Sequence, residues 1–341
     1  MELYLDSVDF KEVEESQQLG IIAGLTTTPT FMHRHGITDI DAAIVKLSKM
    51  VPVLHIEALG NTVDEILNEA ERQLALGLDP QKTVFKIPVS NIGIAACKKL
   101  RNKGYLVNVH LVYTLTQAYM AMEAGATYVC PLAGRMQDHG IDALTVFAQI
   151  MDVCEKYRYP TKVMFSSVRH TEHVRNALEL GVHTVTAPWN VIKKLNDNNL
   201  TTLGTNQFIE HTKLMTVKVK DVMSQENISV PVHTTIMDAL VKMTASGLGA
   251  VCIVDQDQNL IGVFTDGDLR RKIKEMGESV LFKKMSDLEF KPPIAISGDS
   301  LLFEAVRFFK DYQVDNIVVK ENNKPIGMID IQDFVKMGLV G

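Results

Sequence analysis

Short apolar segments rich in β-branched residues recur eight times in the first two-thirds of this 341-residue chain. Between them lie segments with helical spacing, such as the run that carries Leu67, Ala70 and Leu74. Eight alternating β and α units over about 200 residues predict a closed α/β barrel of the TIM, or (β/α)8, type. The predicted strands are 3–5, 21–25, 53–56, 83–85, 106–109, 127–130, 162–165 and 184–186.

Reactive or anion-binding side chains follow seven consecutive predicted strands. In a (β/α)8 barrel the active site lies at the C-terminal ends of the strands. Chance capping or surface pairing would scatter such residues over both ends of the barrel, so their gathering at one end predicts a site there. The residues are Asp6, Thr27, Thr28, Glu57, Lys86, His110, Arg135, Ser167 and Arg169.

Lys86 is the single cation in the apolar run 84–89. Burial disfavours the charged ammonium, and a neutral amine is a nucleophile that attacks a carbonyl carbon to form a Schiff base. The resulting iminium is an electron sink that lets a neighbouring C–C bond break. The alternative is a lysine whose ammonium reaches solvent at the strand end. The polar residues around Lys86 favour the catalytic interpretation.

Two carboxylates are candidates for moving protons during this chemistry. Asp6 and Glu57 end strands that are separated by one other strand, so each can act directly or through a water. Two carboxylates beside one lysine also influence one another's titration.

Arg135 and Arg169, with the Ser167 hydroxyl, offer charge-assisted donors for a phosphate on the substrate. The alternative is surface pairing of the two arginines with Asp138 or Glu172. We favour phosphate binding because both arginines follow strand ends.

Residues 1–213 resemble the transaldolase and fructose-6-phosphate aldolase family, most closely its short forms. The resemblance implies that Lys86 is the Schiff-base lysine, that Asp6 is the proton shuttle and that Glu57 holds the catalytic water. It also implies that the substrate is a sugar phosphate and that no cofactor is needed beyond the covalent Schiff base. Arg135, Ser167 and Arg169 would hold the phosphate. The matching stretches are MELYLDS at 1–7, GLTTTP at 24–29, KIPV at 86–89, 124–135, and SSVR at 166–169.

Three positions depart from the family pattern. The family has Asn at the position of Thr28, Asn or Thr at that of His110, and Phe or Tyr at that of Leu132. With Thr27, the first two are candidate substrate-binding residues, and in the family they contact the donor's hydroxyls or order the water. The departures imply a donor other than fructose 6-phosphate or impaired chemistry.

The last third of the chain contains one pattern twice. The closing aspartates of the two copies, Asp268 and Asp333, are about 65 residues apart, which is too long for a solenoid unit. Each copy is predicted to run helix, strand, strand, helix. The matching pairs are 221–224 with 284–286, 238–240 with 304–306, 251–254 with 316–319, and 262–268 with 327–333.

This segment resembles a CBS-domain pair, a module that binds nucleotides. The stretch GVFTDGDLRR at 262–271 is particularly like the C-terminal half of arabinose-5-phosphate isomerases. Thr265, Asp268 and Asp333 are the candidate nucleotide-binding residues, and helix capping alone is the alternative for Thr265 and Asp268. In the second copy Asp330 stands where Ser or Thr is expected and would repel phosphate. We therefore expect one competent nucleotide site, in the first copy.

These divisions predict three domains: the barrel at 1–213, and CBS domains at 216–278 and 279–341. A net charge of −6 and a pI near 5.9 argue against nucleic acid as a main partner. Four widely spaced cysteines indicate a reducing compartment. The absence of an apolar N-terminal leader and of any 18-residue apolar run predicts a cytoplasmic protein without a membrane partner. Ten histidines without ligand spacing predict no metal.

The leading hypothesis is a class I transaldolase or aldolase that cleaves or transfers a ketose-derived C3 (dihydroxyacetone) unit through Lys86. A nucleotide or nucleotide-sugar on the CBS pair would regulate it, and the chain would form a homo-oligomer. The alternative is a catalytically altered barrel that serves as a nucleotide-sensing regulator or scaffold in sugar or polysaccharide biosynthesis. Thr28 and His110 support this alternative. A purine-nucleotide dehydrogenase is disfavoured because Cys130 lacks a flexible Gly/Ser-rich loop and the CBS pair is appended to the barrel.

Overall fold

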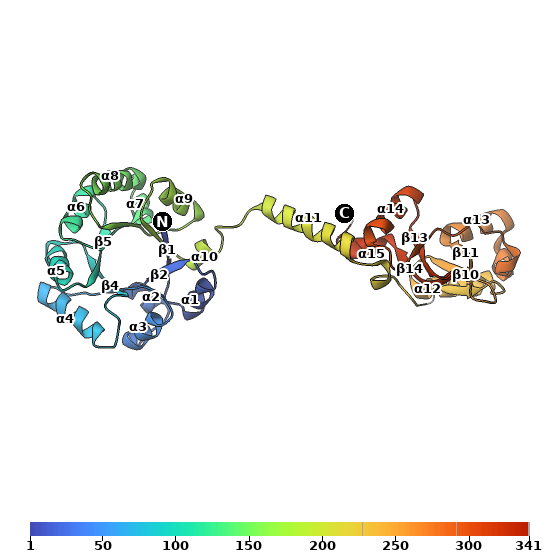
Figure 1. Cartoon of the computed structure of the whole chain (residues 1–341), viewed down its shortest axis with the longest axis horizontal. Coiled ribbons are helices and arrows are strands. Elements are labelled where there is room, and N and C mark those ends of the chain that lie inside the picture. The colour runs from blue at the N-terminus through green and yellow to red at the C-terminus, as the bar shows by residue number, and fades with distance from the viewer. Residues whose placement is uncertain (227, 291, 340–341) are drawn as a thin grey trace. The chain divides into compact units, whose positions relative to one another are not determined.

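A computed structural model describes residues 1–226, 228–290 and 292–339. The chain divides into two compact units, Met1–Asp197 and Asn198–Gly341. The first is a closed barrel whose eight strands follow chain order, which confirms the predicted fold (Figure 1). The strands are β1 (Glu2–Asp6), β2 (Ile22–Thr26), β3 (Leu54–Glu57), β4 (Thr83–Pro88), β5 (Leu106–Val112), β6 (Tyr128–Pro131), β7 (Lys162–Phe165) and β8 (Thr184–Ala187).

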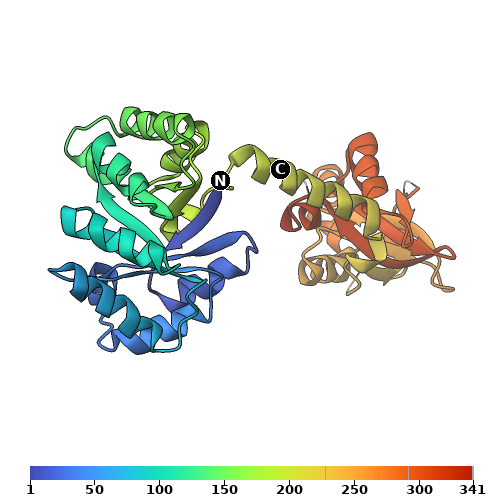
Figure 2. The ribbon, with the colours of Figure 1, turned by 60° about the vertical axis from the view of Figure 1, so that its left-hand side comes forward.

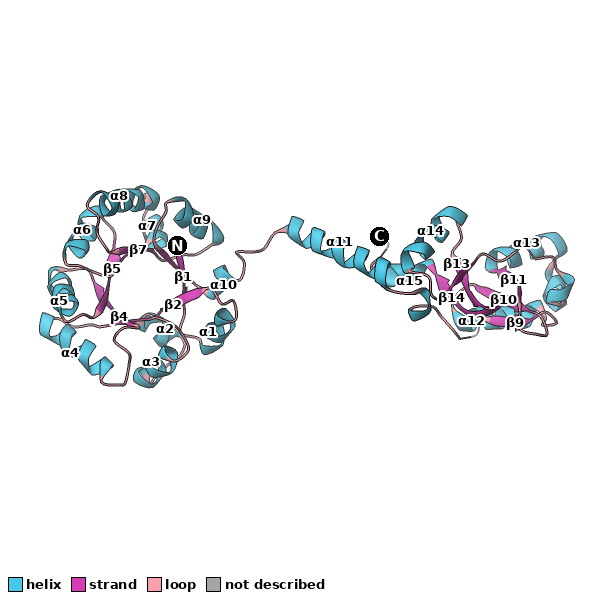
Figure 3. Ribbon diagram, in the orientation of Figure 1, coloured by secondary structure: helices cyan, strands magenta, loops and turns pink. Residues whose placement is uncertain are grey.

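Helices surround this ring of strands (Figure 3), and a second view shows the same arrangement (Figure 2). All strand pairs of the barrel are parallel, and β1 closes the barrel by pairing with β8. The helices are α1 (Phe10–Gln17), α2 (Pro29–Arg34), α3 (Ile40–Ser48), α4 (Val63–Leu74), α5 (Asn91–Asn102), α6 (Leu115–Glu123), α7 (Ala133–Asp138), α8 (Ala143–Lys156), α9 (Thr171–Glu179) and α10 (Trp189–Ile192).

The alternation of side chains along β4 explains how the barrel presents Lys86. Successive residues of a strand point to opposite faces of the sheet. Phe85 and Ile87 belong to the large apolar cluster that also contains the buried residues of the helices, whereas Val84 packs with Tyr4 and Tyr128 in a separate cluster. Lys86 shares the face of Val84, so the strand directs it into the barrel.

The second unit contains both copies of the repeated pattern. Each copy has the predicted helix, strand, strand and helix, preceded by a three-residue strand that the sequence did not reveal. The first sheet is β9 (Ser229–Pro231), β10 (Ala250–Val254) and β11 (Leu260–Thr265), and the second is β12 (Ala295–Ser297), β13 (Asn316–Glu321) and β14 (Lys324–Asp330). The helices are α11 (Asn199–Thr216), α12 (Ile236–Ser246), α13 (Asp266–Met276), α14 (Leu302–Tyr312) and α15 (Ile331–Lys336), with 3-10 turns at Val219–Asp221, Glu278–Phe282 and Met285–Asp287.

The two copies exchange their leading segments. Val219, at the start of the first copy, lies in the apolar core of the second copy with Leu302. Met285, at the start of the second copy, lies in the core of the first with Ile236. A further cluster joins residues of both copies, among them Cys252 with Val318. Each core is therefore completed by the other copy.

Helix α11 includes the predicted barrel boundary at residue 213, and the compact units divide earlier, after Asp197. Large apolar side chains on α11, among them Leu200 and Phe208, are mostly exposed. Among the described residues, no helix is both long enough and apolar enough to cross a lipid bilayer.

Candidate active site

Lys86 lies inside the barrel at the C-terminal half of β4 and is only 4% exposed. Its Nζ atom is 2.9 Å from Oε1 of Glu57, the residue directly opposite it on β3. The same nitrogen donates a hydrogen bond of 2.7 Å to the carbonyl oxygen of Thr27. A buried ammonium is tolerated only when paired and hydrogen-bonded, and these two oxygens fulfil that requirement.

His110 approaches the same carboxylate from β5. Its Nε2 atom lies 2.9 Å from Oε2 of Glu57, so Glu57 has Lys86 on one oxygen and His110 on the other. Burial lowers the pKa of His110, although Glu57 acts in the opposite direction. Burial alone would raise the pKa of Glu57, but the charge of Lys86 and the contact with His110 together hold it below its ordinary value. The carboxylate is therefore kept ionised.

Asp6 accepts the last hydrogen bond of a chain formed by two threonines. Thr26 Oγ1 is 2.8 Å from Asp6 Oδ1 and 2.5 Å from Thr186 Oγ1. An ionised carboxylate only accepts, so Thr26 donates to Asp6 and Thr186 donates to Thr26. Burial raises the pKa of Asp6, while the charge of Lys86 and the Thr26 hydrogen bond oppose that rise. Sequence reasoning missed both threonines, although Thr186 is the polar end of the eighth predicted strand.

A polar layer lies inside the barrel on the same strands. Nδ1 of the buried His55 is 3.1 Å from Asn108 Nδ2, and the Tyr4 and Tyr128 hydroxyls are 3.1 Å apart. Burial, with the charge of Lys86, lowers the pKa of His55 well below its ordinary value, so the ring is neutral. The signal for this layer was a single polar residue within each of two apolar runs, at 53–56 and 106–109.

The predicted phosphate ligands occupy neighbouring ends of the barrel strands. A Cβ placed on Gly134 would lie 2.9 Å from Arg169 Nε and 3.1 Å from Ser167 Oγ, so α7 packs directly on these two residues. Ser167 has a φ of 59°, a left-handed conformation that is uncommon outside glycine and is typical of functional sites. Arg135 Nη1 is 3.4 Å from the Tyr113 hydroxyl.

Arg169 forms a bidentate ion pair with Asp138, the pairing that sequence reasoning set aside in favour of phosphate binding. This pair is half exposed. A phosphate that uses Arg169 therefore has to compete with Asp138.

Thr27 and Thr28 have hydrogen-bonding partners within the protein. The buried Thr27 hydroxyl donates to the His55 carbonyl at 2.9 Å, and the Thr27 carbonyl accepts from Lys86. Thr28 is the N-cap of α2, and its hydroxyl accepts from the Phe31 amide at 3.2 Å. Substrate contacts by these side chains stay a prediction.

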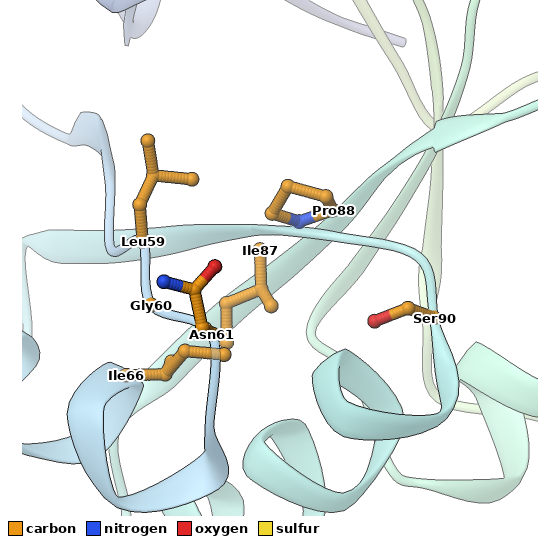
Figure 4. Close-up of a pocket in the computed structure, with 7 residues that line it drawn as sticks. All are labelled: Leu59, Gly60, Asn61, Ile66, Ile87, Pro88 and Ser90. Atoms are coloured by element: carbon orange, nitrogen blue, oxygen red, sulfur yellow. The ribbon is translucent and has the colours of Figure 1, made fainter.

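Two hollows lie beside the loops at this end of the barrel. One, of about 350 Å³, has Thr27 and Glu57 in its wall and is therefore next to the cluster around Lys86. The other, of about 380 Å³, lies between the loops that follow β3 and β4, and Lys86 does not line it (Figure 4). Its lining residues are Leu59, Gly60, Asn61, Ile66, Ile87, Pro88 and Ser90.

Cys130 is buried near this site, and burial raises its pKa to about 11. The thiol is therefore protonated at neutral pH and is a poor nucleophile. Over 1–226, 228–290 and 292–339, no three His, Cys, Asp or Glu side chains gather closely enough to hold a metal ion.

The candidate nucleotide residues form helix caps. Thr265 and Asp268 make a reciprocal capping box at the start of α13, and Asp268 also pairs with Arg271 at 2.6 Å. Burial would raise the pKa of Asp268, but its contacts with Thr265 and Arg271 lower it. In the second copy Asp330 and Asp333 cap α15, and burial raises the pKa of Asp330.

The sequence pattern of the Transaldolase/Fructose-6-phosphate aldolase family matches residues 3–230, and the CBS-domain pattern matches 219–275 and 285–339. A probable transaldolase of Cytophaga hutchinsonii is 36% identical over 219 residues, covering 63% of this chain and 99% of that protein. A probable transaldolase of Shouchella clausii is 33% identical over 210 residues, covering 61% and 95%.

A crystal structure of a CBS-domain containing protein from Agrobacterium tumefaciens aligns with a TM-score of 0.32 and 25% identity, covering 35% of this chain and 91% of that one. The pattern match spans well over half of the chain. The chain therefore belongs to the transaldolase and fructose-6-phosphate aldolase family and carries a CBS-domain pair after the family's barrel.

Proposed function

We propose that the barrel is a class I aldolase or transaldolase that cleaves or transfers a ketose-derived C3 (dihydroxyacetone) unit of sugar phosphates. The observation that carries this proposal is the buried Lys86 nitrogen held 2.9 Å from the Glu57 carboxylate inside the barrel. The names of the Cytophaga and Shouchella relatives, both probable transaldolases, support the same activity.

The chemistry divides among the clustered residues. The Lys86 ammonium gives a proton to Glu57, and the free amine attacks the ketone carbon. The carbonyl oxygen takes up that proton and a second one from the nitrogen and leaves as water, which gives an iminium. Asp6 accepts the proton of the hydroxyl on the carbon beyond the scissile bond, the C–C bond breaks, and its electron pair moves into the iminium to form an enamine. The aldehyde leaves, and the enamine either adds to an acceptor aldehyde or takes a proton on carbon, which regenerates an iminium. Addition of water to that iminium releases the product ketose or dihydroxyacetone and frees Lys86.

Borohydride trapping tests this proposal. Reduction in the presence of phosphorylated ketoses is expected to add the mass of one reduced C3 or ketose unit to Lys86, located by peptide mass mapping. Lys86→Met is expected to lose the adduct and at least three orders of magnitude in rate, because the iminium cannot form. Lys82→Met, which removes an exposed lysine just before the same strand, is the matched control. An adduct of equal yield in Lys86→Met, or none in the wild type, contradicts the proposal and favours a regulatory or scaffold role.

The proposed regulation is the binding of a nucleotide or nucleotide-sugar to the first CBS copy. Thr265 and Asp268 support this copy because they supply a hydroxyl and a carboxylate at the start of α13. The second copy places two carboxylates, Asp330 and Asp333, at the equivalent turn, where they disfavour a phosphate.

The proposal places the enzyme in the cytoplasm as a homo-oligomer. Four free, buried cysteines support a reducing compartment, and the exposed apolar side chains of α11 support self-association. Sedimentation equilibrium of the wild type and of Phe208→Ser is the test. A wild type that is monomeric at micromolar concentration contradicts the oligomer.

A further inference from the structure

Three neighbouring strands bring Glu57, Lys86 and His110 into one line of contacts. Glu57 and Lys86 are directly opposite in the register of β3 and β4, and His110 is opposite Pro88 in the register of β4 and β5. Oε1 of Glu57 faces Lys86 Nζ at 2.9 Å, and Oε2 faces His110 Nε2 at 2.9 Å. The two oxygens of one buried carboxylate are thus divided between the nucleophile and an imidazole.

The backbone of β5 is distorted immediately after His110. The register shifts between His110 and Val112, and Leu111 has a φ of 56°. A bulge of this kind re-aims a side chain, and a left-handed φ is strained at a leucine. The strained residue therefore directly follows the histidine whose ring contacts Glu57. His110 itself is only 9% exposed.

We propose that His110 is a positioning residue that acts through Glu57: its Nε2 edge, 2.9 Å from Oε2, holds the carboxylate in the orientation that takes protons from Lys86. This inference rests on the proposed Schiff-base function. The two atoms are at contact distance, although their alignment does not meet hydrogen-bond geometry, so the interaction is an electrostatic contact.

The proton balance shows what Glu57 must do. Starting from the ammonium, Nζ loses two protons as the iminium forms, and the carbonyl oxygen gains two protons and leaves as water. Glu57 takes each proton from Nζ at Oε1 and passes it to the departing oxygen. No other proton source is consumed, so one carboxylate completes the exchange if it stays correctly oriented and ionised between transfers.

Removal of His110 has a defined electrostatic consequence. The charged groups that act on this pair are Lys86 on β4, Arg135 on α7 and, through Lys86, Asp6 on β1. The contact with His110 lowers the pKa of Glu57. Its loss therefore raises that pKa, and the carboxylate becomes protonated at a higher pH during acidification.

The test is the rate of borohydride-trapped adduct at Lys86 as a function of pH, for wild type, His110→Leu and His110→Asn. His110→Leu is expected to slow trapping at neutral pH about tenfold or more, since the polar contact that orients Glu57 and helps to keep it ionised is lost. The pH at which the trapping rate falls off on the acidic side (the acidic limb) is expected to rise by about one unit. His110→Asn keeps an N–H donor and is expected to recover most of the rate and of the wild-type limb.

Three outcomes overturn the inference. The first is a His110→Leu protein that traps at the wild-type rate with an unshifted limb. The second is a His110→Asn protein that behaves like His110→Leu, because a donor would then not be what matters. The third is an equal loss in His33→Leu, a control at an exposed position on α2. Absence of any adduct in the wild type would instead remove the Schiff-base function itself, so the two failures are distinguishable.

Discussion

Asp6 depends on side chains from both strands that flank β1. Thr26 comes from β2 and Thr186 from β8, and together they pass one hydrogen bond to the carboxylate. The carboxylate is therefore oriented across the seam at which the barrel closes. Its raised pKa and the lowered pKa of Glu57 separate the two acids, which gives them different protonation behaviour beside a single lysine.

Thr26→Val removes the hydroxyl that donates to Asp6 and preserves the shape of the side chain. That hydrogen bond lowers the pKa of Asp6, so its loss raises the pKa, and the ionised carboxylate disappears at a higher pH during acidification. We expect the acidic limb of kcat/KM to move upward by about half a unit to one unit. Thr184→Val is the control, because its hydroxyl faces the Val163 carbonyl. Equal shifts in both variants would count against the role of Thr26.

Asp138→Asn frees Arg169 from its carboxylate partner. An exposed ion pair contributes about 0–1 kcal/mol, so its removal is expected to lower KM for a phosphorylated ketose by up to about fivefold. Arg169→Ala is expected to raise the same KM at least tenfold, and the non-phosphorylated analogue is expected to respond little to either change. Steady-state kinetics with both substrates measure these KM values. Equal effects on the two substrates would exclude a phosphate role for Arg169.

Sequence alone predicted that the candidate residues gather, because strand ends in a barrel meet at one face. It placed Lys86, Glu57 and His110 at that face, and the structure brings them together. It could not predict that His110 reaches Glu57, since the bulge at Leu111 has no signature in the residue pattern. The pairing of Arg169 with Asp138 depends on two side-chain conformations, and the sequence was compatible with either partner.

Helix α7 is a six-residue element whose packing fixes the predicted phosphate site. Gly134 lies in its first turn, and a Cβ there would be 2.2 Å from the Ser167 carbonyl oxygen. A methyl group at that distance from a backbone carbonyl oxygen is accommodated only if α7 or the loop that carries Ser167 moves.

Local residue patterns also explain why the short strands β9 and β12 were missed, because three residues are too few for a period to be recognised.

Gly134→Ala is expected to weaken binding of phosphorylated donors at least tenfold and to lower the Tm, because the new methyl group displaces α7 from Ser167. Gly204→Ala is the matched control on α11, where a Cβ would meet no atom within 4 Å. That change is expected to raise helix stability by about 0.5–1 kcal/mol without an effect on KM. Calorimetry and kinetics measure the two properties separately. An unchanged KM in Gly134→Ala would show that α7 does not shape the site.

The whole chain combines a transaldolase-family barrel with a CBS-domain pair, and the proposed regulation requires the two to be coupled. Coupling free energies are typically about 1–3 kcal/mol, equivalent to roughly 5–150-fold in affinity. By linkage, a nucleotide that changes substrate affinity must itself bind with an affinity that depends on substrate. Both measurements are possible on the intact chain.

Calorimetric titration with a panel of adenine and cytidine nucleotides and nucleotide-sugars is expected to detect one site per chain. Asp268→Ala is expected to abolish binding and Asp333→Ala to leave it intact, because Asp330 disfavours phosphate in the second copy. Saturating substrate is expected to shift the nucleotide affinity at least fivefold. Loss of binding in Asp333→Ala alone would reverse the assignment of the site.

The exchange of leading segments between the CBS copies has a consequence for synthesis on the ribosome. The barrel has every strand once β8 has emerged, so it can close while the remainder is still being translated. The first CBS copy cannot complete its core until Met285 appears, and the second needs Val219, made long before. The nascent chain thus completes its barrel first, and the module proposed to regulate that barrel matures only near the end of translation.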